Sequence, residues 1–164
     1  MLESILTEND CASCKRCCRF EADELIDAPL FTEQSSLEIV IKTRGGVTFT
    51  QVQGLWRINL IPDATTSKYR CPMLDDMHGC ILKEKRPLDC QSWPFYLTQN
   101  DAGYMVAISP YCPITNRLQK KLLADVARRE VMQPLLNMIR HHPESITFYR
   151  DEFFPLFYVN LPKK

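Results

Sequence analysis

A small α+β domain is the fold that the sequence predicts, with a β-hairpin, a long C-terminal helix and cysteine-rich loops bound to metal. Three observations lead to it: helical and strand patterns alternate along the chain, residues 61–95 show little periodicity, and eight cysteines are present. With 164 residues, 45% of them hydrophobic and 24% charged, the chain has the composition of a globular protein. Its length suits one hydrophobic core, so we expect residues 1–164 to form a single domain.

The first predicted helix covers residues 33–43. Thr32 suits the N-cap position that precedes a helix, and Gly45–Gly46 provides a stop signal after it. An apolar face is expected where three side chains recur at helical spacing, namely Leu37, Val40 and Ile41.

A β-hairpin is predicted next in the chain. Residues 47–52 and 55–60 are rich in strand-forming side chains and flank Gln53–Gly54, a sequence suited to a tight turn. Residues 61–95 carry several Pro, Cys and Asp residues, so we expect mostly loop there, held by something other than a strand ladder. Residues 104–109 read as a further strand.

The strongest helical pattern covers residues 116–140, where apolar side chains follow helical spacing. Pro134 lies inside it and predicts a kink or a break into two helices at that position. The tail, residues 148–161, is rich in aromatic residues. Two interpretations remain open for the tail: it closes the core, or it offers a docking surface for a partner.

The cysteines fall into groups, and this grouping points to chemistry. Residues 11–18 hold a C-x2-C-x2-C-C cluster, a wider trio follows in a proline-rich stretch, and one cysteine stands alone before Pro113. The candidate metal ligands are Cys11, Cys14, Cys17, Cys18, Cys71, Cys80, Cys90 and Cys112. Thiolates at C-x2-C spacing converge on one side of a turn, which is typical of tetrahedral zinc and of iron–sulfur clusters.

Metal binding is favoured over disulfides by the expected compartment. The first ten residues lack a basic segment and an apolar segment, so we expect no signal peptide and a cytoplasmic protein. Thiols in that compartment stay reduced. No apolar run approaches the roughly 18 residues of a membrane span. With 20 basic and 20 acidic residues, net charge indicates neither nucleic acid nor a membrane as partner. An unidentified protein or small molecule remains the expected partner.

Eight cysteines divide naturally into two sets of four, which predicts one or two metal centres. One centre is expected around Cys11, Cys14 and Cys17, and another around Cys71, Cys80 and Cys90. Cys18 and Cys112 complete them in an order that the sequence leaves open. Adjacent side chains such as Cys17 and Cys18 point to different sides of extended backbone, so the two are expected to serve different roles.

Basic residues border both cysteine groups and can offset the negative charge of thiolates. Lys15, Arg16 and Arg19 accompany the first group, and Arg86 lies between Cys80 and Cys90. Because Pro87 follows Arg86 and stiffens the backbone, Arg86 is a better candidate than the lysines to contact a metal-binding cysteine without binding the metal itself. His78, two residues before Cys80, is a candidate ligand or general base, although an exposed turn histidine is the simpler interpretation.

Three segments carry a resemblance to a known family. They are Cys11-x2-Cys14-x2-Cys17-Cys18, then Cys71-Pro72-Met73-Leu74 through Gly79-Cys80-Ile81, then Arg86-Pro87-Leu88-Asp89-Cys90 running into Trp93-Pro94-Phe95. The sequence resembles the zinc- or iron-chelating domain proteins of the CxxCxxCC cysteine-cluster group, which include flagellin lysine methylases. The resemblance covers about residues 11–113, leaving the helical and aromatic part, 114–164, outside it. It implies bound zinc or iron held by these cysteines.

An iron–sulfur cluster, [4Fe-4S], is the expected cofactor, with zinc as the alternative. The triple C-x2-C-x2-C run and the wide spacings that follow differ from the paired knuckles of structural zinc sites. Aromatic residues near the cysteines (Phe20, Trp93, Phe95 and Tyr111) are expected to shield a cluster from water. Three functions remain open: a redox or accessory protein, a zinc-binding structural module, or a cluster-dependent modifying enzyme related to protein lysine methylases.

Overall fold

The α+β class is confirmed by a computed structural model that describes residues 2–160. The chain divides into two compact units, one formed by Cys11–Cys90 and the other by Met1–Asp10 with Gln91–Lys164. We describe each unit by itself. Within residues 2–160, no helix is both long enough and apolar enough to cross a membrane.

The unit of residues 11–90 is built from short elements. Its helices are α1 (Glu8–Cys14), which begins just before the unit, α2 (Glu33–Lys42) and α3 (Leu88–Ser92), which ends just after it. The 3-10 turns are Arg16–Cys18, Ala22–Asp27 and Lys83–Lys85. The strands are β1 (Arg19–Phe20), β2 (Leu30–Phe31), β3 (Phe49–Val52), β4 (Leu55–Ile58), β5 (Ile61–Pro62), β6 (Tyr69–Arg70), β7 (Leu74–Asp75) and β8 (Gly79–Cys80). Three small sheets result, in the orders β2-β4-β3, β1-β6-β5 and β7-β8.

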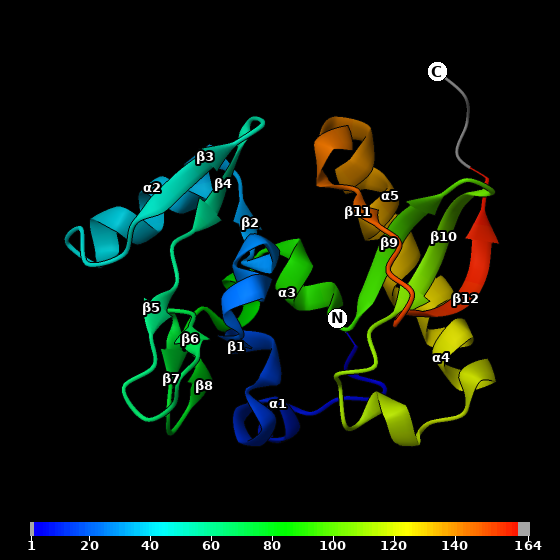
Figure 1. The fold of residues 1–164 in the computed structure, drawn as a ribbon, viewed down its shortest axis with the longest axis horizontal. Helices are drawn as coiled ribbons and strands as arrows, with labels where there is room; N and C mark the ends of the chain where they lie inside the picture. Colours follow the sequence, from blue (N-terminus) through cyan, green and yellow to red (C-terminus); the bar gives the residue numbers. More distant parts are fainter. Residues whose placement is uncertain (1, 161–164) are drawn as a thin grey trace. The chain divides into compact units, whose positions relative to one another are not determined.

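The predicted hairpin is confirmed as β3 and β4. Its register pairs Phe49 with Ile58 and Val52 with Leu55. Gln53 and Gly54 both take positive φ angles, 49° and 88°, which are the angles of a two-residue type I′ turn. The hairpin lies beside α2 in this unit (Figure 1).

Helix α2 confirms the predicted helix, and Thr32 caps it by accepting a hydrogen bond from the backbone N–H of Ser35 at 3.3 Å. The predicted apolar face is wrong. Ser36 and Ile39 are the buried residues of α2, whereas Leu37 and Ile41 are 54% and 75% exposed. A burial stripe along Ser36 and Ile39 includes a small polar residue, which hydrophobic spacing alone cannot identify.

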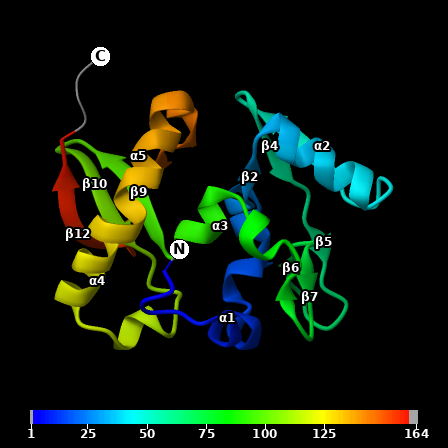
Figure 2. The same cartoon turned by 180° about the vertical axis from the view of Figure 1, so that it is seen from behind.

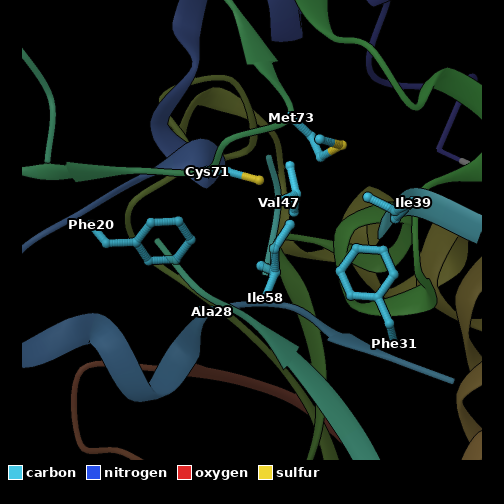
Figure 3. Close-up of a cluster of buried hydrophobic side chains, with 8 residues drawn as sticks. All are labelled: Phe20, Ala28, Phe31, Ile39, Val47, Ile58, Cys71 and Met73. Atoms are coloured by element: carbon cyan, nitrogen blue, oxygen red, sulfur yellow. The ribbon is translucent and has the colours of Figure 1, made fainter. Parts of the chain in front are cut away.

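One apolar core holds this unit together, and cysteines form part of it. Its buried members come from β1, β2, β4, α2 and the loops between strands: Phe20, Ala28, Phe31, Ile39, Val47, Ile58, Cys71 and Met73. Figure 3 shows the Cys71 side chain directed into this group. Cys18 and Cys80 pack against the same cluster, so three of the predicted ligands border an apolar core.

The second unit is a four-stranded sheet covered by helices. Its order is β11-β9-β10-β12, with β9 (Phe95–Asn100), β10 (Gly103–Ile108), β11 (Thr147–Phe148) and β12 (Phe154–Val159). Strand β10 confirms the strand predicted at residues 104–109. Helices α4 (Lys120–Val126) and α5 (Met132–His141) lie across one face of this sheet (Figure 2). Fully buried side chains such as Phe95, Val106 and Val126 fill the space between them.

The long C-terminal helix is confirmed with two corrections. It begins at Lys120 rather than Asn116, because Leu118 is extended with a ψ of 151°. Its interruption is a π-helical segment at Ala127–Val131, which lies before Pro134 rather than at it. The proline ring crowds the carbonyl of the residue four positions earlier, Glu130, so the irregular hydrogen bonding falls one turn upstream.

The aromatic tail joins the sheet in part. Strand β12 pairs with β10, and the Phe153 ring stacks on Tyr96 with centroids 5.0 Å apart. Phe153 is buried, whereas Phe154 and Tyr158 are 52% and 61% exposed. The tail thus closes one edge of the core while leaving aromatic surface outside it.

Candidate metal centre

Backbone hydrogen bonds bring three cysteine-bearing segments together in the unit of residues 11–90. The N–H of Cys71 donates to the carbonyl of Cys18 at 2.9 Å, and the β1–β6 ladder continues this pairing through Arg19 and Arg70. The β7–β8 pair then sets Leu74 opposite Cys80. Segments that are more than 50 positions apart in the sequence therefore meet with their cysteines.

A close approach at Gly79 joins the first cysteine cluster to the β7–β8 turn. A Cβ atom at Gly79 would lie 3.1 Å from the Cα of Ala12 and 3.2 Å from its Cβ. Gly79 also has a φ of 74°, in the left-handed region that favours glycine. A glycine before Cys80 lets helix α1, which carries Cys11 and Cys14, pack directly on this turn.

Four thiols are close enough to raise one another's pKa. A hydrogen bond with Cys18 and burial hold the pKa of Cys17 well above its ordinary value. Burial, together with charge on Cys80 and Cys17, raises the pKa of Cys71 to about 12. Burial also raises the pKa of Cys90, as do charges on Cys17, Asp89, Cys71 and Cys80. Cys17, Cys71, Cys80 and Cys90 therefore share one electrostatic environment, and we call them the four-thiol group.

Adjacent cysteines Cys17 and Cys18 occupy a 3-10 turn, with their sulfurs 3.8 Å apart. Cys17 belongs to the four-thiol group, while Cys18 packs against the apolar core. The extended backbone expected at this pair is wrong, since both residues lie in a 3-10 turn, and the difference in role stays a prediction.

Two arginines act on this group. The positive charge of Arg86 lowers the pKa of Cys17 and of Cys80, and that of Arg70 lowers the pKa of Cys71, against the larger effects that raise them. Arg86 Nε donates to the carbonyl of Lys83 at 2.7 Å. Near the first cluster, Arg16 lies 2.7 Å from the carboxylate of Glu24.

None of the eight cysteines, which all lie within residues 2–160, forms a disulfide. Cys11 and Cys14 lie on α1 in the same unit as the four-thiol group, at intermediate exposure. Cys112 is buried in the other unit, where its carbonyl accepts a hydrogen bond from the Thr115 hydroxyl. The predicted shielding aromatics divide in the same way: Phe20 lines the core beside Cys71, whereas Trp93, Phe95 and Tyr111 belong to the second unit.

His78 lies on the surface of the β7–β8 turn. Its side chain is 80% exposed, and its Nδ1 lies 2.9 Å from an Asp75 carboxylate oxygen. The same oxygen accepts the backbone N–H groups of Met77 and His78 at 2.9 and 2.7 Å, which closes the turn. Asp75 and His78 therefore act as turn residues that contact each other.

No three His, Cys, Asp or Glu side chains within residues 2–160 stand in an arrangement that could hold a metal ion. The four-thiol group is thus a neighbourhood of donors rather than a formed coordination sphere. The partition into two centres stays a prediction, and the electrostatic contacts favour a different grouping, with Cys17 beside Cys71, Cys80 and Cys90.

An ion-pair network beside the cysteines was not predicted from the sequence. Arg19, which follows Cys18, and Arg70, which precedes Cys71, both approach Asp76 in the β7–β8 turn. The arginines next to Cys18 and Cys71 were a sequence signal for such a network. Their acidic partner, Asp76, lies in a turn whose conformation the cysteine spacing does not predict.

Among known proteins, no family model matches the chain, and no curated protein or solved structure matches it either.

Proposed function

We propose that the unit of residues 11–90 carries a metal centre on the four-thiol group, an iron–sulfur cluster with a redox or accessory role. One observation carries the proposal. Four thiols from four separate segments share one electrostatic environment beside an apolar core. Structural cysteines that serve only packing have no need to gather in this way, because each thiolate makes its neighbours harder to ionise.

The donor chemistry of the group fits a thiophilic metal. Thiolates are the ligands of iron–sulfur clusters and of tetrahedral zinc. A bound cation would counter both burial and the charges of neighbouring thiolates, which raise the pKa of Cys71 and Cys90. Binding also requires the four sulfurs to draw closer together than the structure holds them.

Supporting groups surround the four thiols on two sides. Arg86 supplies positive charge toward Cys17 and Cys80. The apolar core, with Phe20 and Met73, limits the access of water to Cys71. The positive charge stabilises a cluster with net negative charge, and the apolar core protects the cluster from water.

Iron–sulfur is proposed over zinc on the spacing of the cysteines, which differs from the paired knuckles of structural zinc sites. Zinc is the second candidate, because a set of four thiols also satisfies a tetrahedral zinc ion. In that case the metal would serve a structural or interaction module. A modifying enzyme related to lysine methylases rests on the resemblance alone.

Anaerobic purification with iron, sulfide and zinc analysis and a visible spectrum tests the proposal. We expect brown protein with about four iron and about four sulfide per chain, as one [4Fe-4S] cluster requires. Colourless protein with about one zinc per chain would support the zinc candidate instead. Protein that is folded and holds neither metal would refute a metal centre.

Single replacements test the assignment of ligands. Cys17→Ser and Cys90→Ser are expected to lose the metal and to fold poorly, because bound metal contributes directly to folding. Cys112→Ala is the matched control: Cys112 is also a buried thiol but is not one of the four-thiol group, so the metal content should not change if that group holds the metal. Soluble Cys17→Ser protein with an unchanged metal content would contradict the assignment.

A further inference from the structure

Asp76 contacts the three segments that carry cysteines, two through its carboxylate and one through its backbone carbonyl. Its Oδ2 lies 2.9 Å from Nη1 of Arg70, and its Oδ1 lies 3.5 Å from Nη2 of Arg19. The backbone carbonyl of Asp76 accepts a hydrogen bond from Nζ of Lys15 at 2.5 Å. Lys15, Arg19 and Arg70 belong to the first cysteine cluster, to β1 and to β6. One residue thus contacts all three.

Both arginines are also held at a second point. Nε of Arg19 lies 3.1 Å from Oδ2 of Asp63, whose side chain is fully buried. Asp63 in turn accepts hydrogen bonds from the backbone N–H and the hydroxyl of Thr65, at 2.9 and 2.7 Å. Arg70 donates to the carbonyl of Leu74 as well as to Asp76. Arg70 is therefore oriented by two hydrogen bonds, whereas Arg19 is held by ion pairs with Asp63 and Asp76 that lack hydrogen-bond geometry.

The sequence places each member of this network next to a thiol. Arg19 directly follows Cys18, Arg70 directly precedes Cys71, and Asp76 stands in the turn that leads into Cys80. A displacement of any of these backbones moves the neighbouring sulfur with it.

We infer that Asp76 is a positioning residue, which holds the segments of Cys17, Cys71 and Cys80 in mutual register through Arg19, Arg70 and Lys15. For its relevance to metal the inference rests on the proposed function; the register itself can be measured without metal. The Asp76 side chain is 56% exposed, and exposed ion pairs contribute little to global stability. The expected effect of Asp76 is therefore local, on the cysteine segments.

The experiment compares Asp76→Asn with Asp125→Asn in the full-length protein. Asp125 is the matched control, since it is 52% exposed and pairs with Arg128 on helix α4 of the other unit. The first readout is the rate of alkylation of each cysteine by iodoacetamide, followed by mass spectrometry. The second is the rate at which metal passes to a chelator.

We expect Asp76→Asn to raise alkylation of Cys71 and Cys80 and the rate of metal loss by up to about fivefold, the change that loss of a half-exposed ion pair allows. Alkylation of Cys112 should not change, and Asp125→Asn should behave as wild type. Asp76→Glu, which keeps the charge, should restore most of the protection. Salt at about 1 M should bring wild type toward the variant, because ion pairs at this exposure are screened.

Equal alkylation of Cys71 and Cys80 in Asp76→Asn and wild type overturns the inference. An increase in Cys112 alkylation as large as that of Cys71 and Cys80 also overturns it, because that would indicate destabilisation of the whole protein rather than a displacement of the cysteine segments. If wild type holds no metal, the proposed function fails, and the alkylation rates still decide the role of Asp76.

Discussion

Gly79 shows how one backbone position can determine whether two cysteine segments meet. Its φ of 74° lies where side chains are disfavoured, and the space beyond its Cα is filled by the backbone of Ala12. Backbone atoms cannot rotate away as a flexible side chain can. A methyl group at Gly79 therefore has to push helix α1 from the β7–β8 turn.

Replacing Gly79 by alanine should destabilise the protein more than the same replacement at Gly45. Gly45 has nearly the same φ, 79°, but a Cβ there meets nothing within 4 Å. Both variants bear the backbone strain of about 1 kcal/mol, and Gly79→Ala should cost at least about 1 kcal/mol more through the clash with Ala12. Urea unfolding of the two variants measures the difference. Equal losses in the free energy of unfolding would show that Ala12 moves aside without an energetic penalty.

At the scale of residues, sequence reasoning picked out the cysteines better than their grouping in space. The eight cysteines and Arg86 were visible because their spacing is unusual. The segments of Cys17, Cys71 and Cys80 meet through β1–β6 and β7–β8 pairing, which joins distant positions, and Cys90 comes from helix α3. Spacing along the chain does not report such contacts, so Asp76 and Gly79 were not recognised as structural partners of the cysteines.

Short elements in the unit of residues 11–90 depend on side-chain caps. Glu24 closes the 3-10 turn Ala22–Asp27 by accepting the backbone N–H of Glu21 at 2.8 Å. It also binds Arg16 through both oxygens, at 2.7 and 3.2 Å. Arg16 opens the turn that holds Cys17 and Cys18. The Glu24 carboxylate thus connects the 3-10 turn Ala22–Asp27 to the 3-10 turn Arg16–Cys18.

The Glu24 contribution should depend on pH in a defined direction. Burial raises the pKa of Glu24, but hydrogen bonds from Arg16 and Glu21 and nearby positive charge outweigh burial and hold its pKa below 4.5. A lowered pKa means that the stabilisation is present above the unfolded-state pKa and is lost as pH falls through the folded-state pKa. Glu24→Gln should therefore reduce the free energy of unfolding by about 1 kcal/mol at neutral pH, and the difference from wild type should shrink below about pH 4.

Urea unfolding of wild type and variant at each pH checks this, because effects of pH that are common to both cancel in the difference. Glu38→Gln, an exposed position on α2, is the control and should differ little from wild type throughout. A Glu24→Gln deficit that stays constant down to acidic pH would contradict a role for the ionised carboxylate.

At the scale of elements, the sequence predicted those with strong local signals. The Thr32 cap and the Gln53–Gly54 turn are encoded within a few residues, so α2 and the hairpin were found. The buried face of α2 depends on what packs against it. The position of the π-helical segment depends on where the helix accommodates the steric clash of the Pro134 ring with the preceding turn. Both are properties of packing rather than of local pattern.

The two units differ in the length of their strands, and therefore in how much their sheets stabilise each fold. Residues 91–160 contain three strands of six residues and two helices around fully buried side chains such as Phe95 and Val106. Residues 11–90 contain six strands of only two residues, namely β1, β2, β5, β6, β7 and β8. Such short ladders are marginal without further support. The prediction that residues 61–95 are mostly loop, held by something other than a ladder, is wrong in part, because β5 pairs with β6 and β7 with β8 there. The single-domain prediction stays a prediction.

Removal of metal should therefore loosen one unit and spare the other. If the four-thiol group holds the metal, a chelator applied under reducing conditions removes the link between β1, β6 and the β7–β8 pair. Hydrogen exchange followed by mass spectrometry should then show amides in residues 11–90 exchanging about tenfold faster or more, whereas β9 and β10 keep their protection. The Cys112→Ala protein, treated in the same way, should give the same pattern. Equal loss of protection in both units, or none in residues 11–90, would mean that metal is not what stabilises these short strands.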